Sequence, residues 1–468
     1  MLIIMDAKLR IKIDNRLLSI DIFNVHLHMT TINDSSMKQL LCLCATLIMY
    51  ITGIAQNQIH QSDVRFVAVP DHADWNYRTG ENARIDLQVF AYGVPYDGAE
   101  VSYEIGPELL PADTKGTLTL KNGRATLSMG TMKKPGFRDC RFTVKHGGKQ
   151  YKHHVKVAFS PEKIVPTVKM PTDFEEFWTR TKEEAAKCPM TVQRTFVPEY
   201  SNEKVDCYLI KLQCYRKGQY VYGYLTQPKA KGTYPVVFNP PGAGIKPMDP
   251  LKTMYFAENG IICFNMEIHG IRPNLDAATY KEISAAFSSS DNGYLVNGLD
   301  NRENYYMRKV YMACVRALDY LTSLPEWDGK NLIAQGGSQG GALAIITAGL
   351  DKRITQCVAN HPALSDMEGY LHDQCGGYPH LIRSNEQLTK EKVKVLAYYD
   401  VVNFAKQLTV PTYLTWGYND NTCPATTSYA VYNSITAPKE ALITPINEHW
   451  VSTETRHNQM YWIKDHLK

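Results

Sequence analysis

Three polar residues in the C-terminal half have the types and the chain order needed to activate a serine hydroxyl. The first is Ser338, because Gly336-Gly337-Ser338-Gln339-Gly340 matches the pattern G-x-S-x-G. This segment follows the apolar run 331–335 and precedes the helix-favouring run 342–346. A sharp turn from strand to helix exposes a serine beside a base, and glycines leave room around it. We therefore predict that Ser338 is a nucleophile at such a turn.

A serine nucleophile needs a base and an orienting acid, which follow the serine in the order Asp or Glu, then His, in this kind of arrangement. Asp420 comes shortly after the apolar run 412–416 and Gly417. His449 follows the apolar run 441–443 and precedes a last helical stretch. The order predicts that His449 is the base and Asp420 the acid that orients it.

Other residues of the same types fit this pattern less well. Asp366 and Asp400 are the alternative acids, while Asn419 cannot replace Asp420 as an anion. Three histidines precede Asp420 and would break the chain order, and two lie in or near a helical tail: His361, His372, His380, His457 and His466.

A nucleophilic serine also needs backbone N–H groups that stabilise the negative oxygen formed during attack. The N–H of Gln339, directly after the nucleophile, is the first predicted donor. The second is the N–H of Ala243, in the segment 239–244 that follows the apolar run 235–238. The alternative for this second segment is a tight turn without a chemical role.

The elements that would position these residues alternate between apolar strands and helical stretches. A helical stripe of apolar residues runs from Met307 to Leu321. Buried strands separated by helices predict an α/β architecture, with a mostly parallel sheet covered on both faces. The predicted domain spans residues 172–468, and Thr172 and Glu175 have the spacing of a capping box. The apolar runs of strand length are 236–238, 261–264, 332–334, 357–359 and 412–415.

Residues 60–160 have a different pattern, in which short period-two runs alternate with turn residues. Ile85, Leu87 and Val89 alternate with polar residues, and Asn122-Gly123 and Gly147-Gly148 each separate two runs. Such dipeptides suit turns with positive φ. We predict a small all-β sandwich of immunoglobulin-like type, followed by a proline-rich linker at 161–171. A structural role is expected for it, with carbohydrate binding as the alternative.

The N-terminal part contains one strongly apolar stretch, from Leu40 to Ile51. It is too short to span a bilayer comfortably, and it lies between the basic Lys38 and small residues that end at Ala55. These features predict a signal peptide at residues 37–55, an upstream extension at 1–36, and export to the periplasm or the exterior. The alternative is a buried helix, and no membrane anchor is expected.

Composition and charge restrict the class of protein. The chain has 468 residues, of which 44% are hydrophobic and 21% charged, as in a soluble globular protein of two or three domains. Lys and Arg number 51 and Asp and Glu number 47, a net charge of +4, without a dense basic block. We therefore expect no nucleic-acid partner. The 11 cysteines lack the paired spacing of a structural zinc site.

Four segments of this chain, Met170–Trp178, Tyr305–Leu321, Gly336–Gly341 and Gly417–Ile435, occur in the order of a known family. Together they resemble the acetyl xylan esterase and cephalosporin-C deacetylase family, carbohydrate esterase family seven, over roughly residues 165–468. The last segment is the most specific, because Asp420, Cys423-Pro424 and Tyr432-Asn433 fall at the family's spacing. The chain departs from the family where Glu267-Ile268-His269 replaces Arg-Gly-Gln and where Trp450 replaces Glu after the base.

The resemblance implies an α/β-hydrolase fold and the removal of acetyl groups from xylan, xylo-oligosaccharides or related sugars through an acetyl-enzyme. It implies the same three catalytic residues, no metal and no cofactor, and it allows a homo-oligomer. Three aromatic residues are candidate sugar contacts, with core packing as the alternative for each: Tyr305, Tyr306 and Trp416.

Two other classes of function remain open at this point. A serine peptidase of the prolyl-oligopeptidase kind shares the turn and the residue order, although no propeller-sized array of repeats precedes the α/β segment. The other class is a carbohydrate-binding protein without catalytic activity.

Overall fold

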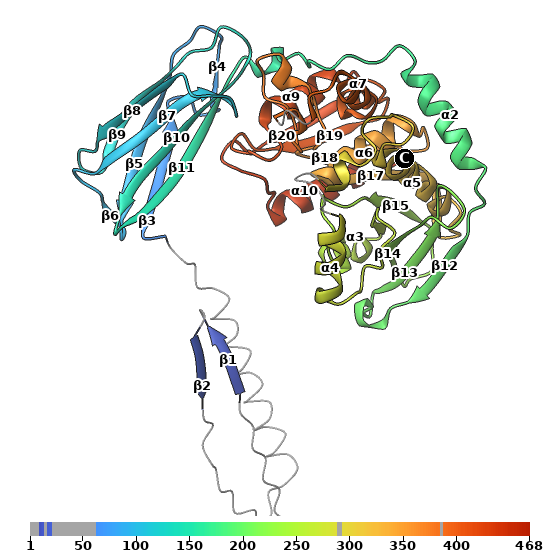
Figure 1. Ribbon diagram of the computed structural model, residues 1–468. Coiled ribbons are helices and arrows are strands. Elements are labelled where there is room, and N and C mark those ends of the chain that lie inside the picture. Colours follow the sequence, from blue (N-terminus) through green and yellow to red (C-terminus); the bar gives the residue numbers. More distant parts are fainter. Residues whose placement is uncertain (1–8, 14–15, 21–61, 288–292, 384–386) are drawn as a thin grey trace, which may run out of the picture. The chain divides into compact units, whose positions relative to one another are not determined.

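The computed structural model describes residues 9–13, 16–20, 62–287, 293–383 and 387–468 (Figure 1). The chain forms two compact units, residues 1–62 and residues 63–468. In the first unit, β1 (Leu9–Ile13) pairs antiparallel with β2 (Arg16–Ile20). The predicted signal peptide at 37–55 lies outside the described residues.

The second unit begins with two sheets that share one hydrophobic core, which we call the β-region (residues 64–159). One sheet has the order β4-β11-β10-β7-β8, and in the other β5 pairs with β3, β6 and β9. Alternate residues of β5, such as Ile85, Leu87 and Val89, are buried in the core between the sheets, as their period-two pattern indicates. The immunoglobulin-like assignment and the domain boundaries stay predictions. The strands are β3 (Val64–Pro70), β4 (Asn76–Tyr77), β5 (Ala83–Ala91), β6 (Val94–Pro95), β7 (Glu100–Pro107), β8 (Thr114–Thr119), β9 (Arg124–Gly130), β10 (Gly136–His146) and β11 (Lys149–Phe159).

The two predicted turns of the β-region have positive φ angles, but they connect the strands differently. Gly147 (φ 55°) and Gly148 (φ 75°) join β10 and β11, which pair antiparallel along their whole length. Asn122 (φ 50°) and Gly123 (φ 71°) also form a turn, closed by the bridge between Lys121 and Arg124. Beyond that bridge β8 pairs with β7 and β9 pairs with β5, so this turn carries the chain from one sheet to the other.

A nine-stranded sheet forms the centre of the remaining chain, in the order β12-β13-β14-β16-β15-β17-β18-β19-β20 (Figure 1). The strands from β16 to β20 pair parallel, as the apolar runs predict, whereas β12, β13 and β14 form an antiparallel edge that the sequence reasoning missed. The strands are β12 (Val192–Phe196), β13 (Val205–Gln213), β14 (Tyr220–Pro228), β15 (Tyr234–Asn239), β16 (Ile262–Met266), β17 (Trp327–Gly337), β18 (Gln356–Asn360), β19 (Thr412–Trp416) and β20 (Lys439–Ile443).

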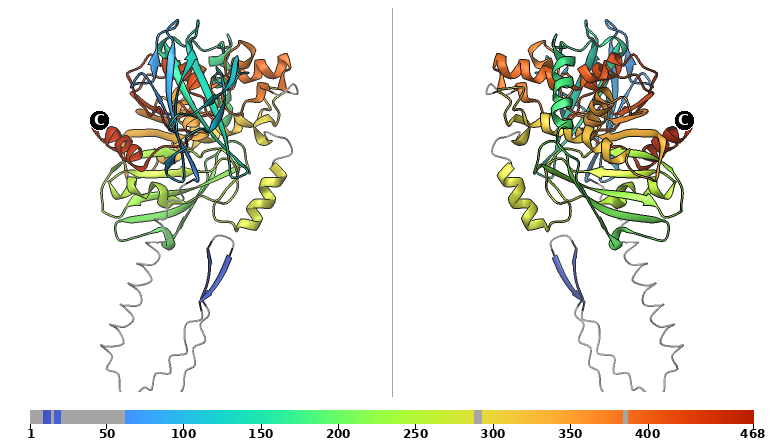
Figure 2. Two further views of the ribbon diagram at one scale, coloured as in Figure 1. Left: turned by 90° about the vertical axis from the view of Figure 1, so that its left-hand side faces the viewer. Right: turned by 90° about the vertical axis from the view of Figure 1, so that its right-hand side faces the viewer.

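Helices cover both faces of this sheet, and the turned views of Figure 2 show the same layers. Neighbouring residues of a strand face opposite cores: Leu332 of β17 packs with α5 and α6, and Ile333 packs with α3 and α10. This confirms the predicted α/β architecture. The helices are α2 (Phe174–Ala186), α3 (Met254–Glu258), α4 (Ala277–Phe287), α5 (Tyr306–Leu321), α6 (Gln339–Leu350), α7 (Lys390–Tyr399), α8 (Val401–Ala405), α9 (Ala425–Ser434) and α10 (Thr453–Asp465).

The predicted capping box before α2 is wrong, although the helix itself is present. Asp173, and not Thr172, is the N-cap residue, and its side chain makes no capping hydrogen bond. The carboxylate of Asp173 instead accepts hydrogen bonds from Arg302 (2.8 Å) and from the Tyr398 hydroxyl. Ion pairing with Arg302 therefore replaces the local cap.

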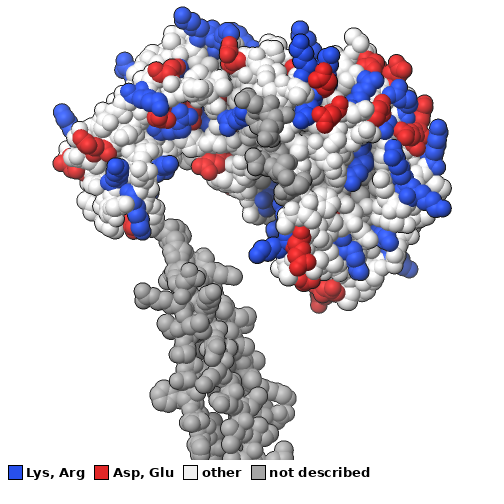
Figure 3. Space-filling model, viewed as in Figure 1, with Lys and Arg blue, Asp and Glu red and all other residues white. Residues whose placement is uncertain are grey.

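The surface of residues 63–468 carries charges of both signs. On the face seen in Figure 3, Lys and Arg side chains are interspersed with Asp and Glu, in keeping with the small net charge of +4. In the part of the chain that the structure describes, no helix is long and apolar enough to cross a bilayer.

Candidate active site

Ser338 lies at the turn between β17 and α6, as predicted. The strand ends at Gly337, the helix begins at Gln339, and Ser338 between them has φ 59°. A non-glycine residue in this region is strained, and such strain is typical of a nucleophile held at a sharp turn. A Cβ atom at Gly340 would lie 2.4 Å from the carbonyl oxygen of Pro240, so only glycine allows the turn to approach this loop so closely.

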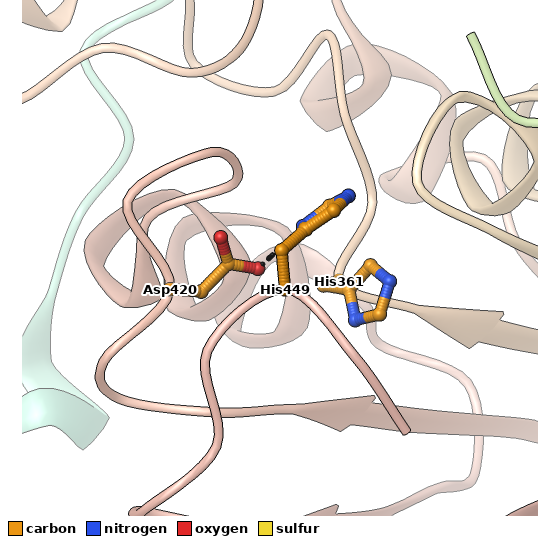
Figure 4. Close-up of side chains that lie close together, drawn as sticks. All are labelled: His361, Asp420 and His449. Carbon is orange, nitrogen blue, oxygen red and sulfur yellow. Dashed lines mark hydrogen bonds and ion pairs between the residues drawn. The ribbon is translucent and has the colours of Figure 1, made fainter. Parts of the chain in front are cut away.

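Asp420 and His449 meet Ser338 from two neighbouring loops. His449 Nδ1 lies 2.7 Å from Asp420 Oδ2 (Figure 4), and His449 Nε2 lies 3.0 Å from Ser338 Oγ. A carboxylate only accepts hydrogen bonds, so the neutral ring donates from Nδ1 and leaves Nε2 free to accept the serine proton. This is the geometry of a nucleophile, base and acid arranged in one chain of hydrogen bonds.

Asp420 is held by its own loop and by the loop that carries His449. Asp420 is buried, and its Oδ1 accepts the N–H groups of Thr422 (2.8 Å) and Cys423 (2.9 Å). Asn419 N–H donates to the carbonyl of Asn447 (3.1 Å), two residues before the base. A Cβ atom at Gly417 would lie 2.0 Å from that same carbonyl oxygen, so the glycine permits the two loops to touch.

His361 also lies in this site, although the sequence reasoning set it aside because of its chain order. Its ring centroid is 4.3 Å from that of His449, and Figure 4 shows the two rings side by side. Parallel strands end at one edge of the sheet, and β17, β18, β19 and β20 are followed by Ser338, His361, Asp420 and His449 in turn. The position of His361 directly after a predicted parallel strand could therefore have placed it in the site.

Among the described residues, His361, Asp420 and His449 are the one group of three with potential metal-ligating atoms within 4.8 Å of one another. Two of these residues, Asp420 and His449, already bond to each other and to Ser338 or the backbone. The donor set is thus occupied by the hydrogen-bond chain, and we assign no metal to it.

Burial of His361 predicts a contribution to stability that is lost in acid. The side chain is 6% exposed, and burial, with the neighbouring His449, lowers its pKa from 6.5 to about 4. Between these values the unfolded chain binds a proton at this position that the folded chain does not, so the contribution of His361 to stability falls as the pH falls from 6.5 to 4. Over this interval the contribution is about 3 kcal/mol.

We expect the His361→Gln variant to lose less stability than the parent between pH 6.5 and pH 4, because it lacks this titration. The measurement is the free energy of unfolding from urea titrations at several pH values. His457→Gln, at an exposed position of α10, is the matched control and should follow the parent. Identical pH dependence in parent and His361→Gln would contradict this origin of the acid sensitivity.

The two predicted backbone donors lie on segments that pack together. Gln339 begins α6, and the loop 240–244 with Ala243 approaches the turn at Gly340. Tyr294, which the sequence reasoning missed, connects them: its hydroxyl donates to Gln339 Oε1 (2.5 Å) and accepts the N–H of Gly244 (3.5 Å). No sequence pattern singles out Tyr294, because its partners are distant in the chain.

A cavity of about 260 Å³ lies beside this loop. Its lining includes Gly242 and Gly244 of the loop together with Glu267, His269 and Tyr280. The Glu267 carboxylate accepts the N–H groups of Tyr222 (2.7 Å) and His269 (2.6 Å), and burial raises its pKa to about 7. Burial also lowers the pKa of His269 to about 4. This segment, which departs from the family pattern, therefore shapes one wall of the cavity.

The three aromatic residues predicted as sugar contacts are all buried. Trp416 is fully buried on β19 and packs on Tyr429, and Tyr305 is 2% exposed with its hydroxyl donating to the carbonyl of Leu295. Tyr306 is 7% exposed and bonds to His269 Nδ1 (2.8 Å). These side chains offer no open ring face to a sugar, so we do not carry this prediction forward.

The alternative acids have other partners. Asp400 accepts the N–H groups of Asp366, Met367 and Val402, and burial raises its pKa to about 8. Asp366 accepts the N–H groups of Thr167 and Val168. Both carboxyl groups thus tie segments of backbone together, and neither has a hydrogen bond to His449.

Known proteins match this chain over most of its length. The family model described as acetyl xylan esterase (AXE1) matches residues 162–466. The chain is 55% identical over 436 residues to the acetyl esterase Axe7A of Xylanibacter ruminicola, covering 93% of this chain and 98% of that protein. The alignment covers so much of this chain that it must include most of the β-region.

Solved structures match a smaller part of the chain. The acetyl xylan esterase from Paenibacillus sp. R4 superposes with a TM-score of 0.58 at 25% identity, covering 65% of this chain and 98% of its own. Acetyl xylan esterase 1 from Thermoanaerobacterium sp. JW/SL YS485 has a TM-score of 0.57 at 22% identity, covering 65% and 97%. These structures have no counterpart for about a third of this chain.

Proposed function

This chain belongs to the acetyl xylan esterase family and is a carboxylic ester hydrolase, and on that basis we propose that it removes acetyl groups from xylan, xylo-oligosaccharides or related acetylated sugars. The observation that carries the proposal is the continuous chain of hydrogen bonds from Asp420 through His449 to Ser338. The matched relatives, named as acetyl esterases and acetyl xylan esterases, support the choice of an acetyl ester.

In the proposed mechanism, Ser338 Oγ attacks the carbonyl carbon of the acetyl ester while His449 Nε2 takes the serine proton. Asp420 stabilises the imidazolium that forms, and the N–H groups of Gln339 and Ala243 stabilise the negative oxygen. Collapse of this intermediate expels the sugar hydroxyl, which takes its proton from His449, and leaves an acetyl group on Ser338. Water, activated by His449, then attacks the acetyl-enzyme and releases acetate.

The cavity beside the loop 240–244 is the proposed place for the sugar part of the substrate, since it is lined by this loop and not by Ser338 or His449. Its volume of about 260 Å³ is slightly below the range of about 300–1,000 Å³ for ligand pockets, which suits one sugar unit and not a buried length of polymer. Glu267 and Tyr280 in its wall are buried and bonded to the backbone, Tyr280 through its hydroxyl to the carbonyl of Arg272 (2.5 Å), so they shape the cavity.

Acetate release tests this proposal directly. We expect release from acetylated xylan, acetylated xylo-oligosaccharides and para-nitrophenyl acetate, no cleavage of peptides, and covalent labelling of Ser338 by an organophosphonate. Peptide cleavage without acetate release would instead support a peptidase of the prolyl-oligopeptidase kind. Neither turnover nor labelling would support a binding protein without catalytic activity.

Export is part of the proposal on the sequence pattern alone, with residues 37–55 as a signal peptide. A polymeric substrate such as xylan is consistent with an enzyme that acts outside the cytoplasm. N-terminal sequencing of the exported protein is the test, and a mature chain that starts before Met37 would contradict the signal peptide.

A further inference from the structure

A buried ion pair lies where the β-region meets the loop of the catalytic acid. Lys156 of β11 is fully buried, and Glu108, directly after β7, is 2% exposed. Lys156 Nζ lies 2.8 Å from Glu108 Oε1. Burying two charges costs desolvation free energy that a pair of apolar side chains would avoid, so such a pair is weak support for stability alone. Its other partners therefore indicate what it does.

Lys156 donates hydrogen bonds to two consecutive residues of the acid loop, Asn419 and Asp420. Its Nζ donates to the main-chain carbonyl of Asp420 (2.7 Å), and its N–H donates to Asn419 Oδ1 (2.9 Å). Asn419 in turn donates to the carbonyls of Asn447 and Ile446 in the loop of the base. The strand β11 is thus connected through one residue to both loops of the triad.

Glu108 holds the other end of the same loop. Its carboxylate accepts the N–H groups of Ala425 (3.2 Å) and Thr426 (3.1 Å), the first residues of α9. These groups have no partner within the helix, and a negative charge is favourable at this end of a helix. The segment 419–426, with the catalytic acid inside it, is therefore held by the β-region at both ends.

Apolar contacts already join the β-region to the same part of the chain. Phe137 of β10 packs against Tyr418 and Tyr429, with ring centroids 4.9 Å and 5.9 Å apart. These contacts join the two parts of the chain without the help of Lys156 and Glu108. The hydrogen bonds of that pair instead converge on the short segment 419–426.

We propose that Lys156 and Glu108 are positioning residues that set the main chain of Asp420, so that its carboxylate meets His449. This rests on the proposed function of the triad. The β-region is then a part of the catalytic unit and not a spacer, and it acts through the acid without touching the substrate.

The double variant Lys156→Met/Glu108→Gln tests this inference, because it removes both charges together and leaves no buried ion unpaired. The amide introduced at position 108 can still accept one N–H group of α9, whereas the thioether introduced at position 156 has no donor for the carbonyl of Asp420. We expect kcat for para-nitrophenyl acetate to fall about 10²-fold, as misplacement of a catalytic group does, with KM changed less than about twofold.

Two further readouts separate positioning from general loss of structure. The downfield proton resonance of the His449 Nδ1–H group should shift or disappear, because the hydrogen bond from this group to the Asp420 carboxylate is weakened. Active-site titration with an organophosphonate counts the reactive sites, so that kcat is expressed per site.

Glu108→Asp is the milder variant, to be used if the double variant does not fold. It keeps both charges but draws the carboxylate away from α9, and it should show the same changes in smaller size.

The matched control is the ion pair of Arg138 with Asp113, which are 2.7 Å apart within the β-region. Arg138 is 7% exposed, and its hydrogen bonds stay inside that region. Arg138→Met/Asp113→Asn should lower Tm while kcat and the proton resonance stay as in the parent.

Unchanged kcat and an unchanged resonance in folded Lys156→Met/Glu108→Gln would overturn the inference, and so would an equal loss of kcat in the control. A parent that is neither labelled at Ser338 nor active on acetyl esters would refute the proposed function. In that case the resonance still decides whether this pair positions Asp420.

Discussion

Replacing Ser338 by alanine is expected to lower kcat for acetyl ester hydrolysis by about 10⁶-fold. In the proposed mechanism the hydroxyl oxygen forms the bond to the acetyl carbon, and among the described residues no other hydroxyl bonds to His449. What remains is binding and stabilisation of the oxyanion, which in serine hydrolases leave about 10³-fold acceleration over the reaction in water. The measurement is acetate release from acetylated xylo-oligosaccharides with purified protein.

The fold should not change in Ser338→Ala. The side chain is only half-buried and its hydroxyl bonds to His449, so Tm should stay close to that of the parent. Ser434→Ala is the matched control, since Ser434 is also half-buried and its hydroxyl bonds to the carbonyl of Ala430. If Ser338→Ala kept a tenth of the parent's kcat, the covalent mechanism would be wrong.

The Asp420→Asn variant should lose about 10⁴-fold in kcat with little change in the hydrogen bonds of its loop. The amide oxygen can still accept the N–H groups of Thr422 and Cys423, which now bond to Oδ1. The amide NH₂ group then faces His449 Nδ1 and favours the tautomer with the proton on Nε2. That tautomer cannot accept the serine proton, and the imidazolium loses its anionic partner.

Asp366→Asn and Asp400→Asn are the controls that separate loss of catalysis from loss of a buried carboxyl group. Both carboxyl groups are buried and bond to backbone N–H groups away from His449, so these variants should lose stability while the folded enzyme keeps its kcat. The assay is kcat per titrated active site, combined with thermal unfolding. A fall in kcat in either control as large as that of Asp420→Asn would show that Asp420 is wrongly assigned as the acid.

The β-region contacts the loop of Asp420, so truncating it would also change the site. Asp420 is held by its own loop, by the loop of the base and by Lys156 of β11. Removal of the β-region would therefore expose apolar side chains such as Tyr418, which packs against Phe137, and at the same time free the acid loop. Point variants at Lys156 and Glu108 are more informative than truncation, because they leave the core intact.

The amino-acid sequence by itself indicated the α/β order of strands and helices, the turn at Ser338 and the three residues that the structure brings within hydrogen-bond distance, whose catalytic roles stay a proposal. These are local or ordered signals: period-two and helical patterns, glycines where a side chain would clash, and a nucleophile, acid and base in a known order. It also indicated the turns at Asn122 and Gly147, because positive φ restricts the residue type strongly.

Only the tertiary structure decided which distant groups surround those residues. His361 was excluded by chain order, yet the parallel strand β18 delivers it to the same sheet edge as the triad. Tyr294, Lys156 and Glu108 act on partners far away in the chain, and a single polar residue carries no pattern that names its partner. Tyr305 and Trp416 point into the core for the same reason, since packing between elements, and not residue type, decides whether an aromatic ring meets solvent.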